Sequence, residues 1–387
     1  MPTPARSYDV IVAGLGAMGS AAVYELSARG VRVLGLDRFA PPHTLGSTHG
    51  RTRIIREAYF EHPLYVPLVR RAYERWDALA AAIGQPTYLT TGGLMIGPAD
   101  GPLVSGALAS AREHDIAHDL LDPATLRRRF PVLCPPEGTV ALLERRAGLL
   151  FPELCIRAYL ELAARHGATL SLEDPLGAWE EESDGVRVHT ARGSYVARRL
   201  LLAVGPWLPE LARDDTLPLE VERQTLHWFA PRERADELTA ARMPLALWEL
   251  ENERLLATFP DTGDGVKVGV HHEGEITTPD AVRRTTTPAE DEEVRALTAR
   301  VIPAAAGTLL EGRVCLYTNT PDHHFLIDQH PAHPAVLLAS PCSGHGFKFA
   351  SAIGEILADL LTDEKPNFDL TPFSLARFGV RSGLRIA

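Results

Sequence analysis

Residues 8–37 read YDVIVAGLGAMGSAAVYELSARGVRVLGLD, and this stretch decides the fold class. The apolar run from Tyr8 to Ala13 predicts a buried strand. The glycine-spaced segment 14–19 follows it, and apolar-rich sequence to about Arg29 predicts a helix. A second apolar run, 31–36, ends on Asp37. Strand, G-x-G-x-x-G, helix, strand and acid occur in the order that a dinucleotide-binding βαβ unit requires.

Each position of this motif has a physical role. Gly14 permits the tight turn, Gly16 lets the backbone approach a pyrophosphate, and Gly19 lets the helix pack closely on the strand. The helix N-terminus presents free N–H groups and a positive dipole end to the phosphates. Asp37 is expected to accept hydrogen bonds from a ribose. The motif predicts an adenine dinucleotide, but it does not choose between FAD and NAD.

Length, composition and charge exclude several classes of protein. A chain of 387 residues is long for one core, so we expect two domains. The net charge of −11 argues against nucleic acid or an anionic membrane as a partner. No apolar run approaches the roughly 18 residues of a membrane span, and the polar start, residues 1–7, does not resemble a signal peptide. We therefore expect a cytoplasmic protein.

Two residue types are distributed informatively. The four cysteines are scattered and lack C-x-x-C spacing, so we expect neither a structural metal nor a disulfide framework. Only three of the 39 basic residues are lysines, namely Lys267, Lys348 and Lys365. A general preference for arginine explains most of this, yet a retained lysine can mark a position that needs a compact ammonium group. Lys365 lies in a polar turn. The other two lysines lie in apolar, glycine-rich sequence and are candidates for a functional role.

A second glycine-rich strand-to-helix junction lies near the C-terminus. A buried strand is predicted at 336–340, and it leads through Pro341 to Gly346 into a helix that ends near Leu361. If this strand shares a sheet with 8–13, its helix also points its N-terminus at the cofactor. We expect an α/β fold with a Rossmann-like domain from both chain ends (1–86, 145–220 and 318–387). An inserted α+β substrate domain with a mostly antiparallel sheet (87–144 and 221–317) completes the expected fold.

Short strings along nearly the whole chain carry a family resemblance. The most specific are SGHGFKF at 343–349 and CLYT at 315–318. Further matches lie at 14–19 with Asp37, 49–56, 200–207, 267–271, 322–328 and 368–373. In these strings the chain resembles the monomeric sarcosine oxidase and N-methyl-tryptophan oxidase family of flavoprotein amine oxidases, within the D-amino-acid-oxidase-like superfamily.

The resemblance implies a cofactor and its surroundings. It implies FAD rather than NAD, so that the domain from both chain ends binds FAD, and a thioether from Cys315 to the flavin. Outside the family pattern, Cys315 would be interpreted as a small core residue. His49 and Arg53 are assigned to the environment and attachment of the flavin ring, although alone they would indicate a solvated basic loop. The glycines of the second junction, Gly344 and Gly346, together with Lys348, are assigned to the cofactor as well.

Oxidation of a secondary amino acid makes three demands on such a site. The substrate carboxylate must be held, and in the family pattern Arg56 and Lys348 do this, since a guanidinium fork matches a carboxylate. Positive charge must stabilise the reduced flavin, to which the helix beginning near Gly346 can contribute. Negative charge that builds on dioxygen needs a fixed cation, and Lys267 matches the oxygen-activating lysine of the family. Lys267, Lys348, Arg53 and His271 form the expected catalytic set.

Other candidates line the predicted substrate pocket. His271 matches a family histidine near the substrate amine, with polar shaping of the pocket as its expected role, and His272 is expected to be a bystander. Tyr317 lies two residues after Cys315 and so faces the same side of a strand, which assigns it to the pocket wall. For His345, a structural role and a place near the flavin are equally compatible with the sequence.

One departure from the family pattern concerns the substrate. The family usually has a tyrosine near a Phe-Pro pair; here the pair is Phe259-Pro260 and the corresponding position is Ala257. The spacing from Pro260 to Lys267 is also one residue shorter than usual. The sequence therefore predicts amine oxidation with room for substrates bulkier than sarcosine.

The predicted function is oxidation of N-methyl amino acids such as sarcosine or N-methyl-tryptophan by a monomeric FAD enzyme, with dioxygen as acceptor and hydrogen peroxide and formaldehyde as products. Alternatives are an oxidase of pipecolate, proline or a fructosyl amino acid, and a dehydrogenase that uses a protein electron acceptor. A non-catalytic flavin-bearing subunit is a third. Lys267 favours oxygen as acceptor, and its presence together with Arg56, Cys315 and Lys348 argues against a non-catalytic role.

Overall fold

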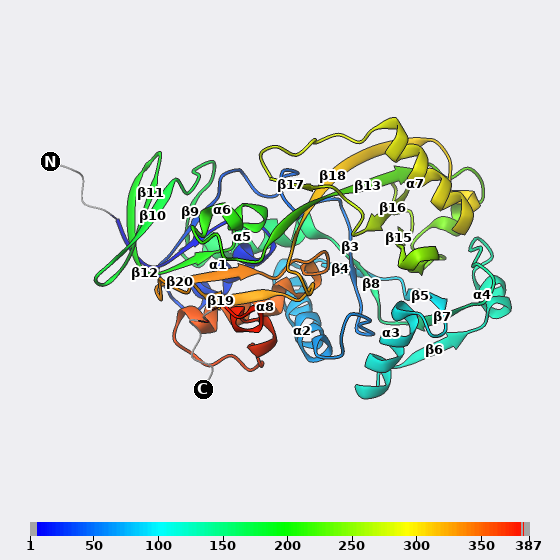
Figure 1. The fold of residues 1–387 in the computed structure, drawn as a ribbon, viewed down its shortest axis with the longest axis horizontal. Helices are drawn as coiled ribbons and strands as arrows, with labels where there is room; N and C mark the ends of the chain where they lie inside the picture. Colours follow the sequence, from blue (N-terminus) through cyan, green and yellow to red (C-terminus); the bar gives the residue numbers. More distant parts are fainter. Residues whose placement is uncertain (1–5, 381, 383–387) are drawn as a thin grey trace.

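The computed structural model describes residues 6–380 and 382, and the N-terminal expectation for residues 1–5 lies outside this range. The chain forms two large sheets joined by a small one (Figure 1). The first sheet has eight strands: β1 (Arg6–Ala13), β2 (Val33–Leu36), β9 (Thr169–Ser171), β10 (Ala178–Glu182), β11 (Gly185–Thr190), β12 (Gly193–Leu202), β19 (Leu326–Gln329) and β20 (Val336–Ser340).

The second sheet has nine strands: β5 (Gly93–Pro98), β6 (His118–Leu121), β7 (Thr139–Glu144), β13 (Glu220–Phe229), β14 (Leu245–Glu249), β15 (Leu255–Phe259), β16 (Val266–His271), β17 (Ile276–Thr277) and β18 (Leu309–Asn319). The small sheet pairs β3 (Arg53–Ile55), β8 (Gly148–Leu150) and β4 (Tyr88–Thr90). The helices are α1 (Ala17–Ala28), α2 (Tyr65–Ile83), α3 (Pro102–Glu113), α4 (Pro123–Arg129), α5 (Pro152–Arg165), α6 (Leu208–Leu211), α7 (Pro288–Val301) and α8 (Ala350–Leu361). Among the described residues no helix is long and apolar enough to cross a membrane.

The first sheet brings both ends of the chain together. β1 pairs in parallel with β2 on one side and β12 on the other, and β12 pairs in parallel with β20. The strands predicted at 8–13 and 336–340 therefore lie in one sheet, with a single strand between them. The residues Val10–Ala13 are all buried, as expected of a parallel strand covered on both faces. The predicted α/β fold is confirmed.

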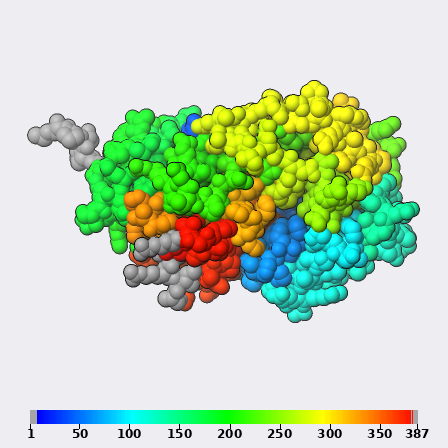
Figure 2. All heavy atoms as spheres, viewed as in Figure 1, coloured from blue at the N-terminus to red at the C-terminus, as the bar shows by residue number. Residues whose placement is uncertain are grey.

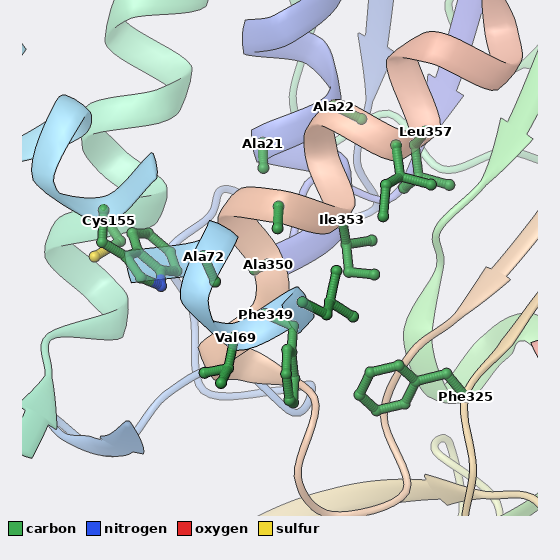
Figure 3. Close-up of a cluster of buried hydrophobic side chains, with 14 of the residues drawn as sticks. Ala21, Ala22, Val69, Ala72, Cys155, Phe325, Phe349, Ala350, Ile353 and Leu357 are labelled. Atoms are coloured by element: carbon green, nitrogen blue, oxygen red, sulfur yellow. The ribbon is translucent and has the colours of Figure 1, made fainter. Parts of the chain in front are cut away.

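Helix α8 packs against α1 and α2 and fixes the C-terminal junction on the sheet. Figure 3 shows the buried side chains between these helices. A Cβ on Gly354 would lie 2.5 Å from the Cβ of Ala21, so a glycine is needed for α8 to approach α1 this closely. Phe325 and Phe349 continue the same core in an edge-to-face contact, with ring centroids 5.3 Å apart.

The second sheet is mostly antiparallel, as predicted, with one parallel pair between β5 and β14. Helix α7 begins in a capping box formed by Thr287 and Glu290, which satisfies the first free N–H groups of the helix. The segment that joins β17 to α7 is yellow in Figure 2. It lies against green residues of the chain. There Asp280 accepts hydrogen bonds from Trp207 Nε1 (3.1 Å) and from Arg38 Nη1 (3.0 Å).

Candidate functional site

A cavity of about 460 Å³ brings together motifs that are far apart in the sequence. It extends from the glycine-rich turn of β1 to the second sheet. Most of the predicted site residues line it: Gly14, Gly16, Asp37, Arg53, Arg56, Lys267, His271, Cys315, Tyr317, Gly344, Gly346 and Lys348. His345 and Ala257 also belong to the wall, whereas Gly19 and His49 are not among the lining residues. One cavity therefore combines the dinucleotide motif with the amine-oxidation candidates.

The three glycines of the first motif have distinct geometries. Gly14 has φ +86°, and a Cβ there would lie 2.4 Å from the carbonyl oxygen of Ala203. A Cβ on Gly19 would lie 1.7 Å from the oxygen of Gly14, so this glycine closes the helix onto the turn. By contrast, the nearest atom to a Cβ on Gly16 is Thr48 Oγ1 at 3.7 Å, and no side chain caps α1 after it. This open helix N-terminus fits a pyrophosphate.

Asp37 contacts the backbone of the same turn. Its Oδ2 accepts a hydrogen bond from the N–H of Leu15 (2.7 Å), and its Oδ1 accepts one from Phe39 (2.7 Å). Burial raises the pKa of Asp37, and these two N–H groups oppose the rise. A carboxylate has about four lone-pair sites, so capacity for a ribose hydroxyl remains on the cavity side. Recognition of a ribose by Asp37 stays a prediction.

Cys315 lies beside the guanidinium of Arg53, from which its Sγ is 3.5 Å distant. The same Sγ lies 3.3 Å from the carbonyl oxygen of Ser47. Arg53 is itself held by the carbonyl oxygens of Thr52 (3.0 Å) and Ser47 (3.1 Å). The thiol therefore lies on the cavity wall with a fixed positive charge beside it.

His49 is buried, and neither of its ring nitrogens has a hydrogen-bond partner among the described residues. Burial, followed by the charges of Arg53, Arg313 and Lys267, lowers the pKa of His49 to about 3, so the ring is neutral. A buried polar group without a partner costs about 1–3 kcal/mol. This orphaned imidazole, the open space at Gly16 and the thiol at Cys315 together fit an FAD in the cavity.

Lys267 projects from β16, and its Nζ is surrounded by oxygen acceptors. Its Nζ donates to the carbonyl oxygens of Thr52 (2.6 Å) and Gly50 (2.9 Å), and the side chain is 2% exposed. The ring of Phe259 lies 4.3 Å from the same Nζ. Burial and then the charge of Arg53 lower the pKa of Lys267 well below its usual value. The oxygen acceptors are the groups that favour an ammonium there.

Arg56 and Lys348 both lie on the wall, but Arg56 already has an anionic partner. Its Nη2 lies 2.7 and 2.8 Å from the two carboxylate oxygens of Glu61. Lys348 Nζ donates to the carbonyl oxygen of His345 (2.7 Å) and to Tyr59 Oη (3.3 Å). Burial and then the charge of Arg56 lower the pKa of Lys348 to about 7, against the opposing charge of Glu61. Glu61 therefore occupies the arginine of the pair that the sequence predicts to bind the substrate carboxylate.

The histidines near the cavity differ in their partners. His271 Nδ1 lies 3.1 Å from Tyr317 Oη, and burial followed by neighbouring positive groups lowers its pKa well below the usual value, so it is a neutral ring. His272 instead faces Glu222, at 3.2 Å. His345 lies on the wall with both ring nitrogens bonded, to Tyr59 Oη (2.6 Å) and to the carbonyl oxygen of His323 (2.9 Å). These two hydrogen bonds give it a structural role in the wall. Its place near the flavin stays a prediction.

Sequence reasoning missed several acids and a tyrosine that hold these groups. Glu61 pairs with Arg56, Tyr59 bridges His345 and Lys348, and Glu153 accepts the N–H of Gly50 (2.8 Å). Glu61 lies five residues after Arg56 in an irregular segment, so the spacing gives no signal for the first contact. Among the described residues, no group of three or more His, Cys, Asp or Glu side chains could hold a metal ion.

Comparison with known proteins identifies the family of the chain. The profile of the family described as FAD dependent oxidoreductase matches residues 9–360. The chain is 46% identical to a monomeric sarcosine oxidase of Streptomyces avermitilis over 92% of this chain and 93% of that protein. It is 41% identical to a monomeric sarcosine oxidase of Bacillus sp. (96% and 97% covered) and 37% identical to an N-methyl-L-tryptophan oxidase of Citrobacter koseri (96% and 99%).

Solved structures share the fold at lower identity. The open form of NikD, an amino acid oxidase of nikkomycin biosynthesis, superposes with a TM-score of 0.83 at 22% identity, covering 98% of both chains. L-proline dehydrogenase from P. horikoshii superposes with a TM-score of 0.82 at 22% identity, covering 97% of this chain and 100% of that one. These two similarities concern the fold alone. With the profile match over most of its length and the cavity that the glycine motif opens into, the chain belongs to the FAD dependent oxidoreductase family.

Proposed function

We propose that this protein is a flavin-dependent amine oxidase of secondary, N-methyl amino acids such as sarcosine or N-methyl-tryptophan. The observation that carries the proposal is that one cavity is lined by Arg56, Lys348, Cys315 and Lys267. Relatives that match nearly the whole chain, at 46% and 37% identity, are named for these two substrates.

The reaction balances with dioxygen and water. An N-methyl amino acid, O₂ and H₂O give the primary amino acid, formaldehyde and H₂O₂. FAD, when bound, accepts the hydride equivalent from the carbon next to nitrogen and passes the electrons to dioxygen. The residues of the chain supply substrate position, charge and the exclusion of water.

The substrate carboxylate is proposed to bind between Lys348 and Arg56. Lysine has three N–H donors and two of those on Lys348 have partners, which leaves one for a carboxylate oxygen. Arg56 becomes available when the Glu61 side chain moves away from it. The substrate carboxylate then replaces the Glu61 carboxylate at the guanidinium. The substrate should therefore be an amino acid and not a simple amine.

His271 and Tyr317 are proposed to position the substrate amine. The neutral imidazole of His271 is hydrogen-bonded to Tyr317 Oη, and both side chains face the cavity. A neutral ring can accept a hydrogen bond from the amine without repelling it. This pair shapes the polar end of the pocket.

Lys267 is proposed to lower the energy of the step in which dioxygen acquires negative charge. Lys267 is buried on the wall of the same cavity, and its Nζ donates to two carbonyl oxygens that favour the ammonium form. A preorganised charge in a site that excludes water stabilises developing charge more strongly than water does. This assignment favours an oxidase over a dehydrogenase with a protein acceptor.

Cys315 is proposed to carry the flavin through a thioether, with Arg53 and His49 assisting. The guanidinium of Arg53 lies 3.5 Å from the Sγ, on the wall of the same cavity. The unpartnered ring of His49 leaves one nitrogen to donate and one to accept a hydrogen bond from the cofactor. The glycines Gly344 and Gly346 line the cavity next to these groups.

The apolar wall next to Ala257 is proposed to admit side chains larger than the hydrogen of sarcosine. Leu247, Leu255 and Ala257 line this part of the cavity. A cyclic substrate such as pipecolate or proline is the second candidate on the same ground. We further propose a cytoplasmic monomer in which 1–86, 145–220 and 318–387 form the FAD-binding domain, and 87–144 and 221–317 the substrate domain.

A peroxide-release screen tests the proposal. Sarcosine, N-methyl-alanine, N-methyl-tryptophan, proline and pipecolate are each compared with the decarboxylated amine. We expect turnover of acids only, with at least one bulkier acid matching or exceeding sarcosine. Equal turnover of the decarboxylated amines would refute the carboxylate site, and a strong preference for sarcosine alone would refute the larger pocket. Flavin that stays with acid-precipitated protein tests the thioether.

A further inference from the structure

Lys267 is held by a single backbone turn. Its Nζ contacts three oxygen atoms, and all three belong to residues 50–52: Gly50 O (2.9 Å), Thr52 O (2.6 Å) and Thr52 Oγ1 (3.3 Å). The position of the ammonium group therefore depends on the conformation of this turn.

The turn has a conformation that needs external support. Gly50 has φ +101° and Arg51 has φ +66°, a region that residues other than glycine rarely adopt. A Cβ on Gly50 would lie 2.8 Å from Leu226 Cδ1, so the first position must be glycine. A non-glycine residue in a left-handed conformation persists where its surroundings determine it.

Glu153 supplies that support from outside the turn. Its Oε1 accepts the N–H of Gly50 (2.8 Å) and the N–H of Arg51 (3.0 Å), which fixes two successive peptide groups. Glu153 is the acidic residue in the first turn of α5, where the helix dipole favours a negative charge. The Glu153 carboxylate thus connects the start of α5 to the turn through hydrogen bonds. The oxygens of the turn accept hydrogen bonds from Lys267.

The charge of Glu153 acts in the same direction as its hydrogen bonds. The groups that face Nζ are Arg53 from β3, Arg51 from the turn, Cys315 from β18, His49 before the turn and Glu153 from α5. Burial and the two arginines oppose an ammonium at this position, whereas a charge on Cys315 and then the charge of Glu153 favour it. Loss of this carboxylate should both loosen the turn and make Lys267 harder to protonate.

We infer that Glu153 is a positioning residue for Lys267: its carboxylate holds the 50–52 turn whose oxygens fix and solvate the ammonium group. The inference rests on the proposed function, since it assigns Glu153 to the reaction with dioxygen. It predicts a selective defect, because the substrate-binding groups Arg56 and Lys348 do not contact Glu153 in the structure.

The test compares Glu153→Ala and Glu153→Gln with Lys267→Met and with Glu161→Ala, an exposed acid on the same helix. Anaerobic reduction by substrate and reoxidation by dioxygen are measured separately by rapid mixing. In Glu153→Ala we expect reoxidation to slow by roughly ten- to a hundredfold, as for a displaced catalytic group, and reduction to stay within about twofold. Glu161→Ala should match the wild-type protein.

Two further readouts separate positioning from general damage. Amide hydrogen exchange in residues 47–56 should accelerate in Glu153→Ala and stay near the wild-type rate in Glu153→Gln, whose amide oxygen can still accept both N–H groups. In Glu153→Gln the loss of reoxidation at high pH should begin at lower pH, because the charge that favours the ammonium is gone. If Glu153→Ala does not fold, Glu153→Gln carries the test alone through this pH profile.

The outcomes distinguish the inference from the proposed function. If Lys267→Met slows reoxidation but neither Glu153 variant alters reoxidation, its pH profile or the exchange of 47–56, the inference is wrong and the role of Lys267 stands. Equal slowing of both half-reactions in Glu153→Ala would also overturn it, since that indicates a structural residue. If Lys267→Met leaves reoxidation unchanged, the proposed role of Lys267 fails.

Discussion

Replacing Lys348 by methionine should weaken recognition of the substrate carboxylate and leave the rest of the site intact. Methionine fills a similar volume, so the packing beside Phe349 and Trp76 should survive. The substitution removes one charge-assisted hydrogen bond to the substrate, worth about 1.5–3 kcal/mol. At tenfold per 1.4 kcal/mol, KM should rise by about ten- to 140-fold.

The pH dependence of the wild-type protein gives this prediction a second measure. Burial and the charge of Arg56 lower the pKa of Lys348 to about 7, so the side chain loses its charge as pH rises through that value. Only the ammonium form attracts a carboxylate. The kcat/KM ratio reports the free enzyme, so it should fall above about pH 7 in the wild-type protein. In Lys348→Met this step should be absent.

The assay is peroxide release with an N-methyl amino acid and with its decarboxylated amine, across the pH range. Lys365→Met, a substitution of an exposed lysine in a surface turn, is the matched control and should behave as the wild-type protein. If Lys348→Met lowers kcat/KM for the decarboxylated amine as much as for the acid, Lys348 does not bind the substrate carboxylate. An unchanged pH step in the variant would show that another group titrates there.

Further substitutions test other parts of the site. Cys315→Ser should release its flavin on acid precipitation while the wild-type protein retains it; retention by the variant would refute the thioether. Glu61→Gln should lower KM for the acid if Glu61 competes for Arg56, and a higher KM would show that Glu61 instead holds the arginine in place. Gly16→Ala should leave the thermal stability of the flavin-free protein nearly unchanged yet lower its FAD content, because the added Cβ meets only Thr48 Oγ1 at 3.7 Å; normal loading would place the pyrophosphate elsewhere. Burial raises the pKa of Glu144 from 4.5 to about 7, so the wild-type chain should lose about 3 kcal/mol of unfolding free energy as pH rises through this interval. Denaturant unfolding at the two ends of the interval should show this loss in the wild-type protein and not in Glu144→Gln; equal pH dependence in both would assign the loss to other groups.

The sequence alone determined the elements whose signals are local. The glycine spacing at 14–19 can be recognised in the sequence because the motif is one short continuous segment. The structure shows a close backbone approach at Gly14, to Ala203, and at Gly19, to Gly14. The strands at 8–13 and 336–340 can be predicted from their apolar sequence, because a parallel strand that is covered on both faces is apolar along its length. Two glycine-rich junctions then sufficed to predict a domain built from both chain ends.

Tertiary structure decided which charged groups meet. The contact of Glu153 with Gly50 spans 103 positions in the chain, and Lys267 reaches Thr52 across 215. No periodicity encodes such a contact, because it depends on how two sheets and α5 pack around one turn. The pairing of Arg56 with Glu61 is closer in sequence, but five residues apart in an irregular segment gives no fixed geometry. The sequence therefore determined which residues are candidates for the site. Only the packing decided which of them are paired with an acid, which are neutral and which are held by backbone oxygens, because these properties depend on burial and on neighbours from distant segments.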